Sequence, residues 1–250
     1  VTPTTHILKP APKDYPGFAE NEHYCLRLAK ALGMAVADSH VEIIADTPVI
    51  VVKRYDRIFD GDRYHRLHQE DFCQSLAIPP TLKYQNEGGP SVKDIAEVLW
   101  DYSHEALTDI KRFADALLFN YLIAGSDAHA KNFSLILTHG SYRLAPLYDI
   151  ASTLPYTNIS QHKVKLAMKI GSEYKLSKTE THHWKTCAKG LRLSPTYLIN
   201  RLQQLAKAMP EAAASTYMEL SAEGLNNRVI QKLETGLKDR SSMLLSNLFE

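Results

Sequence analysis

The sequence predicts an α+β fold in which a small β-rich part precedes a large helical part. Three runs of β-forming residues lie near the start of the chain, with one helical pattern between the first and the second. These runs are Thr5–Lys9, Val41–Ala45 and Val49–Val52. From Val92 onward, apolar residues recur mainly at helical spacing. We therefore expect a β-rich lobe over residues 1–56 and a helical lobe over residues 57–250, connected by Lys53–Asp60.

The composition is that of a globular protein and excludes several other classes. The chain has 250 residues, of which 44% are apolar and 23% charged, so it is long enough to bury a large core. A net charge of +1 gives no overall attraction for a polyanion, and any nucleic-acid contact would be local. Cys25, Cys73 and Cys187 lack a C-x-x-C spacing, which argues against a disulfide framework or a zinc site and favours a reducing cytoplasm. No apolar stretch is long enough to span a bilayer.

The most informative stretch follows an apolar helical pattern over Phe113–Ala124. Asp127 and Asn132 come directly after it and are five positions apart. This is the interval of the protein-kinase loop D-x-x-x-x-N, in which the aspartate accepts the proton of the substrate hydroxyl and the asparagine binds magnesium. A lone match is weak evidence, because aspartate and asparagine are also ordinary turn residues.

A predicted hairpin strengthens this interpretation. Phe133–Leu137 and Tyr142–Leu144 are short apolar runs separated by a polar break, His139–Ser141. Such a hairpin would carry the chain away and return Asp149 beside Asn132, so that a carboxylate and an amide oxygen converge on one Mg²⁺ ion. Phosphoryl transfer uses this metal to neutralise charge on the phosphate oxygens.

The first β-type run ends in a lysine that has two interpretations. In kinases, a lysine near a strand end binds the nucleotide phosphates, and Lys9 has such a position. The local sequence by itself favours an ordinary edge-strand lysine. A predicted helix over Glu20–Leu32 carries Glu22 in its first turn, where it could orient Lys9 or simply favour the helix dipole.

The apolar run Val49–Val52 is followed directly by charged residues, which predicts that the strand ends at a cleft or a sheet edge. Lys53, Arg54 and Tyr55 are candidate hinge residues whose backbone groups could bind the edge of an adenine. Asp56 could meet a ribose hydroxyl or an arginine. The alternative is a solvated strand end without a ligand.

Several further helices are predicted. A helix start lies within Arg66–Ala77, and Lys83–Pro90 is expected to be a loop. The later helices are Val92–Leu99, Trp184–Leu193, Tyr197–Met209, Ala212–Leu220 and Leu225–Phe249, with a short apolar stretch at Val164–Met168. Lys185, Lys189 and Arg192 would share one helical face, which is either solvated or a patch that contacts phosphates.

Several segments, in matching order, together resemble the HipA-type serine/threonine kinases, which are toxins of bacterial toxin–antitoxin modules. The resemblance extends from about Thr2 to Leu193. The segments are T-H-I-L-K-P, E-N-E-H-Y-C-L-R-L-A-K-A-L-G, K-R-Y-D-R, R-L-H-Q-E-D-F-C-Q, K-Y-Q-N-E-G-G-P, I-A-G-S-D-A-H-A-K-N-F-S and Y-R-L-A-P-L-Y-D-I-A-S.

The resemblance implies a divergent, two-lobed protein-kinase fold and ATP-dependent phosphorylation of serine or threonine. Asp127 would accept the proton, Asn132 and Asp149 would bind magnesium, and Lys9 would contact the phosphates. The remaining nucleotide-site residues would be Lys53, Arg54 and Tyr55 as hinge, Asp56 beside the ribose, and His129, Ala130, Lys131, Asn132 and Tyr148 lining the site.

The resemblance also implies targets and partners. The family's target class is aminoacyl-tRNA synthetases, the glutamyl enzyme above all, and their phosphorylation arrests translation and growth and promotes persistence. A small helix-turn-helix antitoxin, HipB, holds the kinase on operator DNA. Lys189 and Arg192 match family positions near that DNA. We therefore expect a bacterial cytoplasmic protein that is associated with the nucleoid when it is in this complex.

One departure from the family leaves other functions open. The family has a Gly-rich loop and an N-terminal subdomain ahead of the T-H-I-L-K strand, and neither is in this sequence, which starts at Val1 within a strand-like run. The chain as written is expected to bind ATP poorly, and we expect it to be part of something longer or a reduced relative. A catalytically silent corepressor is one alternative. A metal hydrolase using Asp127, His129 and Asp149 is another, although it explains neither Lys9 nor the hinge-like strand end.

Overall fold

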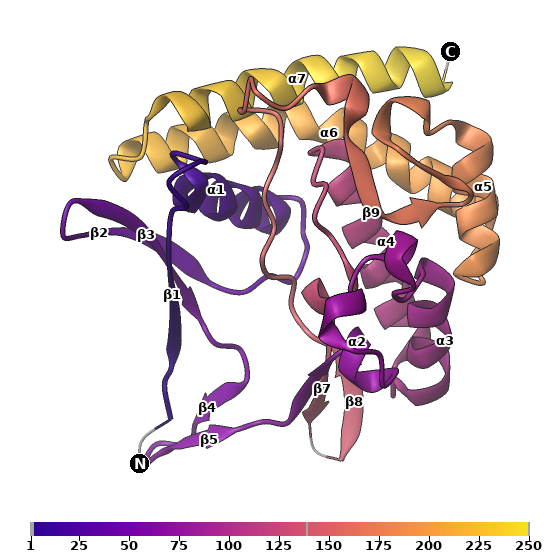
Figure 1. The fold of residues 1–250 in the computed structure, drawn as a ribbon, viewed down its shortest axis with the longest axis horizontal. Coiled ribbons are helices and arrows are strands. Elements are labelled where there is room, and N and C mark those ends of the chain that lie inside the picture. Colours follow the sequence, from indigo (N-terminus) through magenta and orange to yellow (C-terminus); the bar gives the residue numbers. More distant parts are fainter. Residues whose placement is uncertain (1–2, 139, 250) are drawn as a thin grey trace.

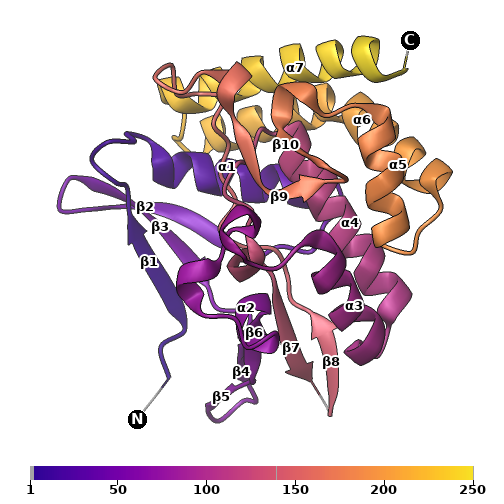
Figure 2. The same cartoon turned by 45° about the vertical axis from the view of Figure 1, so that its right-hand side comes forward.

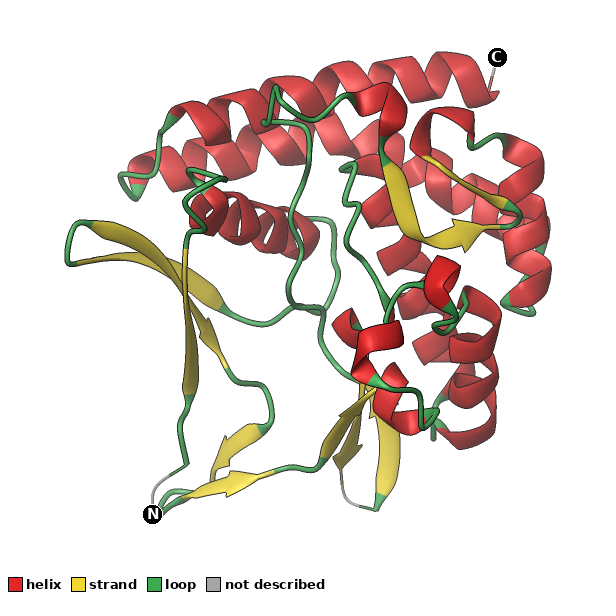
Figure 3. Cartoon of the chain, viewed as in Figure 1, coloured by secondary structure: helices red, strands yellow, loops and turns green. Residues whose placement is uncertain are grey.

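The computed structural model describes residues 3–138 and 140–249; His139, within the predicted break, lies outside them. A β-rich part and a helical part are arranged side by side (Figures 1 and 3). The first sheet is antiparallel with strand order β1-β3-β2. Its strands are β1 (His6–Pro10), β2 (Ser39–Ile44) and β3 (Thr47–Lys53). Lys9 pairs with Ile50, and this register puts Lys9 on an edge strand.

The second and third β-type runs of the sequence, Val41–Ala45 and Val49–Val52, form the hairpin β2–β3, which has a short turn. Thr47 and Pro48 belong to β3, and only Ala45 and Asp46 form the turn. Both have positive φ values, 47° and 61°. A two-residue turn with two positive φ angles matches the twist of antiparallel strands, and Pro48 is tolerated next to the turn.

Helix α1 (Phe18–Ala31) lies between the first sheet and the C-terminal helices. It begins two residues before the predicted helix and buries nearly its whole first half, including the polar side chains of Asn21, Glu22 and His23. Buried polar groups need partners within the fold, so these side chains connect α1 to other segments.

His23 is expected to make the folded state sensitive to acid. Burial, and then the nearby charge of Arg27, lowers the pKa of His23 to about 4, whereas an unfolded histidine titrates near 6.5. Between these pH values His23 is protonated in the unfolded chain but not in the folded one. The free energy of unfolding therefore falls as the pH drops from about 6.5 to about 4. The loss attributable to His23 approaches about 3 kcal/mol, at about 1.4 kcal/mol per pKa unit.

Urea unfolding at several pH values between 4.5 and 7.5 checks this expectation. In His23→Gln the difference from the wild type should shrink as the pH falls. His104→Gln, a change at an exposed position, should leave the wild-type pH dependence intact. Parallel pH curves for wild type and His23→Gln would contradict the assignment. The shifted carboxyl groups elsewhere are common to all the proteins, so their contributions cancel in the differences.

The segment after β3 contains more strand and less helix than predicted. A small hairpin, β4 (Arg57–Phe59) and β5 (Tyr64–Arg66), is followed by β6 (Gln69–Asp71) and the single turn α2 (Phe72–Ser75). The helix predicted within Arg66–Ala77 is therefore mostly wrong. Gln69–Asp71 forms a ladder with β7, and the Asp71 side chain caps α2, so the local helix signal is confined to one turn. The short 3₁₀ turn η1 (Pro80–Leu82) precedes the predicted loop Lys83–Pro90, and a second one, η2 (Gln85–Glu87), lies within it.

Helices α3 (Val92–Tyr102) and α4 (Ala106–Leu122) confirm the next predictions. The predicted hairpin is formed by β7 (Ser134–Thr138) and β8 (Ser141–Leu144), and β6 adds a third strand to the β7 edge. Figure 2 shows this sheet below α4, with the short β4–β5 hairpin beside it. The returning strand β8 packs against the start of α4, where Asp109 and Arg112 bond to Leu144.

The C-terminal part packs around α4 and α1. Its elements are η4 (Gln161–Lys163), β9 (Lys165–Ile170), β10 (Glu173–Lys175), η5 (Leu176–Lys178), α5 (Thr181–Gly190), α6 (Pro195–Ala222) and α7 (Arg228–Phe249). The two helices predicted on either side of Pro210 are one helix, α6. Pro210 removes one backbone donor, but Met209 and Ala213 beside it are fully buried, and their packing favours the continuous helix over a break. In the part of the chain that the structure describes, no helix combines the length and apolar character needed to cross a bilayer.

Candidate active site

The predicted catalytic loop begins where α4 ends. Ala124 has a left-handed conformation with φ 53°, and the N–H of Gly125 donates to the Asn120 carbonyl at 2.7 Å. A Cβ atom on Gly125 would lie 2.5 Å from Asn120 Oδ1, so a larger residue here would require the Asn120 side chain to shift. This exit places Asp127 on an exposed loop, with about two thirds of its side chain accessible.

The hairpin returns Asp149 beside Asn132, as predicted. Asn132 Nδ2 lies 3.1 Å from the Asp149 carbonyl oxygen and 3.5 Å from Asp149 Oδ2. Leu147 fixes the returning chain, because it forms a parallel bridge with Val36. Asp149 itself has φ 57°, a strained value for a non-glycine residue that is often found at functional sites.

Lys9 connects the first sheet to this returning segment. Its Nζ donates to Glu22 at 2.9 Å and to Asp149 at 2.7 Å. The predicted proximity of Glu22 to Lys9 is therefore present. Partial burial lowers the pKa of Lys9, but the attraction of the two carboxylates outweighs it, so the pKa lies above its ordinary value. Burial, helped by the charge of Asp149, raises the pKa of Glu22 although Lys9 opposes it.

Asp127 has a hydrogen-bond donor that the sequence did not reveal. The Tyr84 hydroxyl donates to Asp127 Oδ1 at 2.6 Å, and burial together with this bond raises the Tyr84 pKa, so the hydroxyl stays protonated. The His129 ring packs edge-on against Tyr84 with centroids 5.2 Å apart. Burial lowers the pKa of His129, which favours a neutral ring, although Asp127 opposes this shift. His129 Nδ1 is buried without a partner among the described residues.

A cavity of about 210 Å³ lies beside Lys9 and Asp149. Lys53, Arg54, Tyr55, Asp56 and Tyr148 line it, as do Ile7, Glu22, Ala37, Val52 and Gln69. The rings of Tyr55 and Tyr148 lie 5.8 Å apart, and burial raises the Tyr55 pKa to about 12. The cavity thus joins aromatic surface at one part to Lys9, Glu22 and Asp149 at another.

Backbone hydrogen bonds reduce the number of predicted hinge N–H groups that are available to a ligand. The N–H of Lys53 donates to the Asp38 carbonyl at 2.8 Å, and the N–H of Arg54 donates to the Thr5 carbonyl at 2.9 Å. The Tyr55 N–H has no acceptor within residues 3–138 and 140–249. Of the three hinge N–H groups, Tyr55 therefore has the one that is free to meet a ligand.

Of the predicted nucleotide-site residues that remain, Asp56 lines the cavity and three others do not. Asp56 is buried, and its carboxylate accepts from Arg54 and Arg57, the arginine alternative of its two predicted partners. Burial opposes ionisation there, but the two arginines hold the pKa of Asp56 below its ordinary value. His129 and Ala130 are buried, and Lys131 Nζ binds Asp71 at 2.6 Å; these three do not line the cavity.

Asn21 anchors the segment that follows Asp149. Its Nδ2 donates to the Ser152 carbonyl at 2.8 Å, and its Oδ1 accepts from the Ser152 N–H at 3.0 Å. The Ser152 hydroxyl donates to the Ile123 carbonyl at 2.6 Å. Helix α1 therefore presents Glu22 to Lys9 and, one residue earlier, Asn21 to the segment that follows Asp149, and Ser152 in turn connects that segment to the end of α4.

Replacing Asn21 by alanine is expected to reduce the free energy of unfolding by about 2–3 kcal/mol, because the buried N–H and carbonyl of Ser152 both lose their side-chain partner. Asn21→Asp should be at least as destabilising near neutral pH, because it buries an unpaired carboxylate against the Ser152 carbonyl oxygen. Urea unfolding of the three proteins measures both differences. Equal stability of Asn21→Ala and wild type would show that the contact is not stabilising.

Asn132 and Asp149 have the chemistry of a magnesium site. The Asp149 side chain is 45% exposed, so its carboxylate is accessible to a hydrated cation, and the Asn132 amide lies next to it with Nδ2 toward Asp149. Lys9 neutralises the carboxylate in the structure at 2.7 Å. One oxygen of Glu22 is buried and has no partner among the described residues. These groups fit a divalent ion shared with phosphate oxygens, which would complete the ligand set.

Comparison with known proteins identifies the family. Residues 1–213 match the family described as the HipA-like C-terminal domain. The chain belongs to this family. This HipA-like chain is 38% identical over 242 residues to a Sinorhizobium fredii protein named "Putative kinase Y4mE", covering 96% of this chain and 57% of that protein. It is 31% identical over 229 residues to the serine/threonine-protein kinase toxin HipA of Shewanella oneidensis, covering 87% and 52% respectively.

A solved structure from Shewanella oneidensis, described as the toxin–antitoxin system HipA, HipB and its operator DNA complex, has a TM-score of 0.85 to the HipA-like chain. The two are 26% identical over 97% of this chain and 59% of that one. The α+β, kinase-like fold and the family resemblance predicted from the sequence are thereby confirmed. The HipA-like chain spans a little more than half the length of these curated relatives.

The predicted cationic helix face of the HipA-like chain needs one correction. Lys185 and Lys189 lie on α5 and are exposed. Arg192 is exposed as well, but α5 ends at Gly190 and Arg192 has φ 54°, so it follows the helix rather than sharing its face. These residues lie at the opposite end of the molecule from β1 (Figure 1). Their role in DNA binding stays a prediction, as does the division into lobes at residue 56.

Proposed function

We propose that this chain contains the nucleotide-binding and catalytic residues of an ATP-dependent serine/threonine protein kinase of a bacterial toxin–antitoxin module. The observation that carries the proposal is the convergence of Lys9, Asn132 and Asp149, which are far apart in the sequence. Asp127 lies on the same loop as Asn132, and the sequence spacing of the two is that of the kinase catalytic loop. The family membership supports the same reaction.

The cavity beside Lys9 suits a nucleotide. Tyr55 and Tyr148 offer aromatic surface to a base, and the free N–H of Tyr55 offers a donor to its edge. The volume of about 210 Å³ is below the range of roughly 300–1,000 Å³ common for ligand sites, so it accommodates the base end. The phosphates would extend past Lys9 toward Asp149, where the lysine supplies positive charge.

The acceptor hydroxyl would bind at Asp127. This carboxylate is exposed, and the Tyr84 hydroxyl orients it through a 2.6 Å hydrogen bond. Asp127 would position the hydroxyl and accept its proton as the oxygen bonds to the γ-phosphorus and the bond to ADP breaks. A bound Mg²⁺ ion, held by Asn132 and Asp149, would supply charge neutralisation for the phosphate oxygens.

The direct test is phosphate transfer by the full-length protein. Labelled ATP and Mg²⁺ are incubated with the protein and glutamyl-tRNA synthetase, the acceptor class that the family resemblance implies, and with serine and threonine peptide libraries. We expect label on a serine or threonine that is lost on chelation of Mg²⁺. Labelling that persists without Mg²⁺, or labelling of no acceptor, would overturn the proposal.

The main rival functions predict different results. A metal hydrolase would cleave phosphoesters without ATP, but the described residues hold no group of three His, Cys, Asp or Glu side chains placed to bind a metal. A silent corepressor would bind operator DNA with its antitoxin and transfer no phosphate. The solved relative is in complex with HipB and operator DNA, which supports an antitoxin and DNA as partners of this chain. We propose these partners in addition to the catalytic function.

Lys189 and Arg192 are the residues that we propose contact operator phosphates in that complex. The double change Lys189→Glu and Arg192→Glu is expected to weaken operator binding by the protein–antitoxin complex about equally on all DNA sequences. The salt slope, which is the slope of log Kobs against log salt concentration, should become shallower by the equivalent of about two phosphate contacts. Lys207→Glu and Lys238→Glu, changes on α6 and α7, provide the charge-matched control. An unchanged salt slope in a fluorescence anisotropy titration would remove the DNA role.

A further inference from the structure

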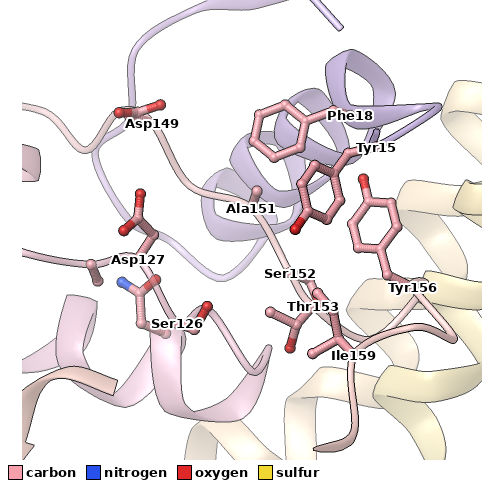
Figure 4. Close-up of a pocket in the computed structure, with 12 residues that line it drawn as sticks. Tyr15, Phe18, Ser126, Asp127, Asp149, Ala151, Ser152, Thr153, Tyr156 and Ile159 are labelled. Atoms are coloured by element: carbon pink, nitrogen blue, oxygen red, sulfur yellow. The ribbon is translucent and has the colours of Figure 1, made fainter. Parts of the chain in front are cut away.

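A second cavity lies on the other side of the two carboxylates. It has a volume of about 270 Å³, and both Asp127 and Asp149 form part of its wall. Figure 4 shows these aspartates at one end and Tyr15, Phe18 and Tyr156 at the other. The remaining lining residues are Asn120, Ser126, Ala128, Ala151, Ser152, Thr153 and Ile159. Lys9 and the hinge-like residues of the first cavity do not line this one.

The far end of this cavity is aromatic and partly open. Tyr15 and Tyr156 pack edge-to-face with their ring centroids 5.2 Å apart. Tyr15 is exposed, while Phe18 and Ile159 are half-buried. Tyr15 lies in the segment between β1 and α1, and Tyr156 lies in the segment after Asp149. Two chain segments thus meet to form an apolar wall that solvent can reach.

Most polar groups around the cavity are already bonded within the fold. The Ser152 and Thr153 hydroxyls donate to the carbonyls of Ile123 and Ala124 at 2.6 and 2.9 Å. The Tyr156 hydroxyl accepts from Asn21 at 3.3 Å, and Asn120 Nδ2 donates to Ala116 at 2.9 Å. Because these four groups are bonded within the fold, the polar groups left to an occupant are mainly the Tyr15 and Ser126 hydroxyls and the two aspartates, and most of the wall offers apolar contact.

The charge distribution also restricts what the cavity can hold. The lining residues include two aspartates and no lysine, arginine or histidine. Asp149 is already paired with Lys9 at 2.7 Å, whereas the donor to Asp127 is the neutral Tyr84 hydroxyl, so Asp127 is the carboxylate that would repel an acidic side chain. An apolar side chain would bury its surface against the aromatic end without this penalty.

We propose that this cavity is the acceptor-side specificity pocket, which receives an apolar side chain of the protein substrate next to the phosphorylated serine or threonine. The proposal rests on the proposed kinase function, because it places the acceptor hydroxyl at Asp127. The pocket begins at Asp127 itself, so a residue close in sequence to that serine or threonine enters it. Tyr15, Phe18, Tyr156 and Ile159 are then specificity-determining residues.

A positional peptide library tests this inference with the full-length protein, labelled ATP and Mg²⁺. Each peptide has one central serine, and the flanking positions are varied one at a time. At one flanking position we expect Leu, Ile, Met or Phe to be favoured over Asp or Glu by about 10-fold or more in kcat/KM. Tyr15→Ala, a change at an exposed site, should raise the KM for the best peptide by about 10-fold.

Ile159→Glu provides a readout that a damaged fold cannot imitate. It should convert the preference at that flanking position from apolar side chains to Lys or Arg, because the new carboxylate lies in the pocket wall. ATP hydrolysis without peptide, an activity measured through the nucleotide site alone, should stay within about 2-fold of wild type for Tyr15→Ala.

The outcomes separate this inference from the proposed function. Transfer to serine peptides without any side-chain preference, or a wild-type preference retained in Ile159→Glu, would overturn the pocket assignment and leave the kinase function standing. Failure of the wild-type protein to phosphorylate any acceptor would overturn the proposed function and, with it, this inference.

Discussion

Replacing Asp127 by asparagine is expected to lower kcat for phosphate transfer by about 10²–10⁴-fold, the usual contribution of a positioned general base. The substitution keeps the size of the side chain and its acceptor oxygen, so the Tyr84 hydroxyl can still bond to it. What is lost is the negative charge that orients the acceptor hydroxyl and accepts its proton. The nucleotide cavity is not lined by Asp127, so the affinity for ATP should change little.

Two variants control this experiment. Asp101→Asn makes the same chemical change at an exposed position on α3 and should have wild-type activity. Tyr84→Phe removes only the hydroxyl that holds Asp127, so we expect a loss of about 10-fold or less. Single-turnover transfer with saturating labelled ATP, together with a fluorescence titration of nucleotide binding, separates chemistry from binding. A rate for Asp127→Asn close to that of wild type would remove this residue from its proposed role.

The sequence predicted the structure best where local sequence patterns determine it. The return of Asp149 to Asn132 could be predicted because an intervening hairpin of two short apolar runs leaves few other paths. The approach of Glu22 to Lys9 was one of two alternatives, and the structure favours it at 2.9 Å. The strong helices were predictable from periodicity, but the continuity of α6 through Pro210 was not, since it depends on packing around Met209 and Ala213.

The contacts that hold the site in place were not predictable, because they join residues far apart in sequence. Tyr84 reaches Asp127 across 43 positions, and Asn21 reaches Ser152 across 131. A tyrosine in a loop has no local pattern that names its partner. Asn21 stands in the polar run Glu20–His23, so the local sequence does not distinguish it from its neighbours.

Asp109 is the clearest case of a structural residue that no motif indicated, and its replacement by alanine is expected to reduce the free energy of unfolding by about 3–5 kcal/mol. Its side chain is fully buried at the start of α4. It accepts from the Ser103 hydroxyl at 2.7 Å, the Leu144 N–H at 2.8 Å, Arg112 at 2.9 Å and Arg143 at 3.0 Å. Burial opposes its ionisation, but these donors hold the pKa of Asp109 below its ordinary value.

The size of this expected effect follows from what the substitution leaves behind. Without the carboxylate, Arg112 and Arg143 keep their positive charges in partly buried positions but lose the anion that pairs with them. The Leu144 N–H also loses its acceptor. Leu144 ends β8, the strand that leads to Asp149, so loosening this contact should also weaken nucleotide binding. Asp109→Asn keeps the shape and two acceptor sites, and it should cost less than the alanine variant.

Asp115→Ala gives a matched control on the same helix. Asp115 pairs with Arg201 at 2.8 Å, but this ion pair is partly exposed, and its loss should cost about 1 kcal/mol or less. Urea unfolding of all four proteins at pH 7, combined with nucleotide titrations, measures both consequences. If Asp109→Ala were no less stable than Asp115→Ala, the buried network would not be what holds β8 against α4. A stability loss without weaker nucleotide binding would instead show that Asp149 keeps its position through contacts independent of Asp109, such as the bridge between Leu147 and Val36 and the bond from Asn132.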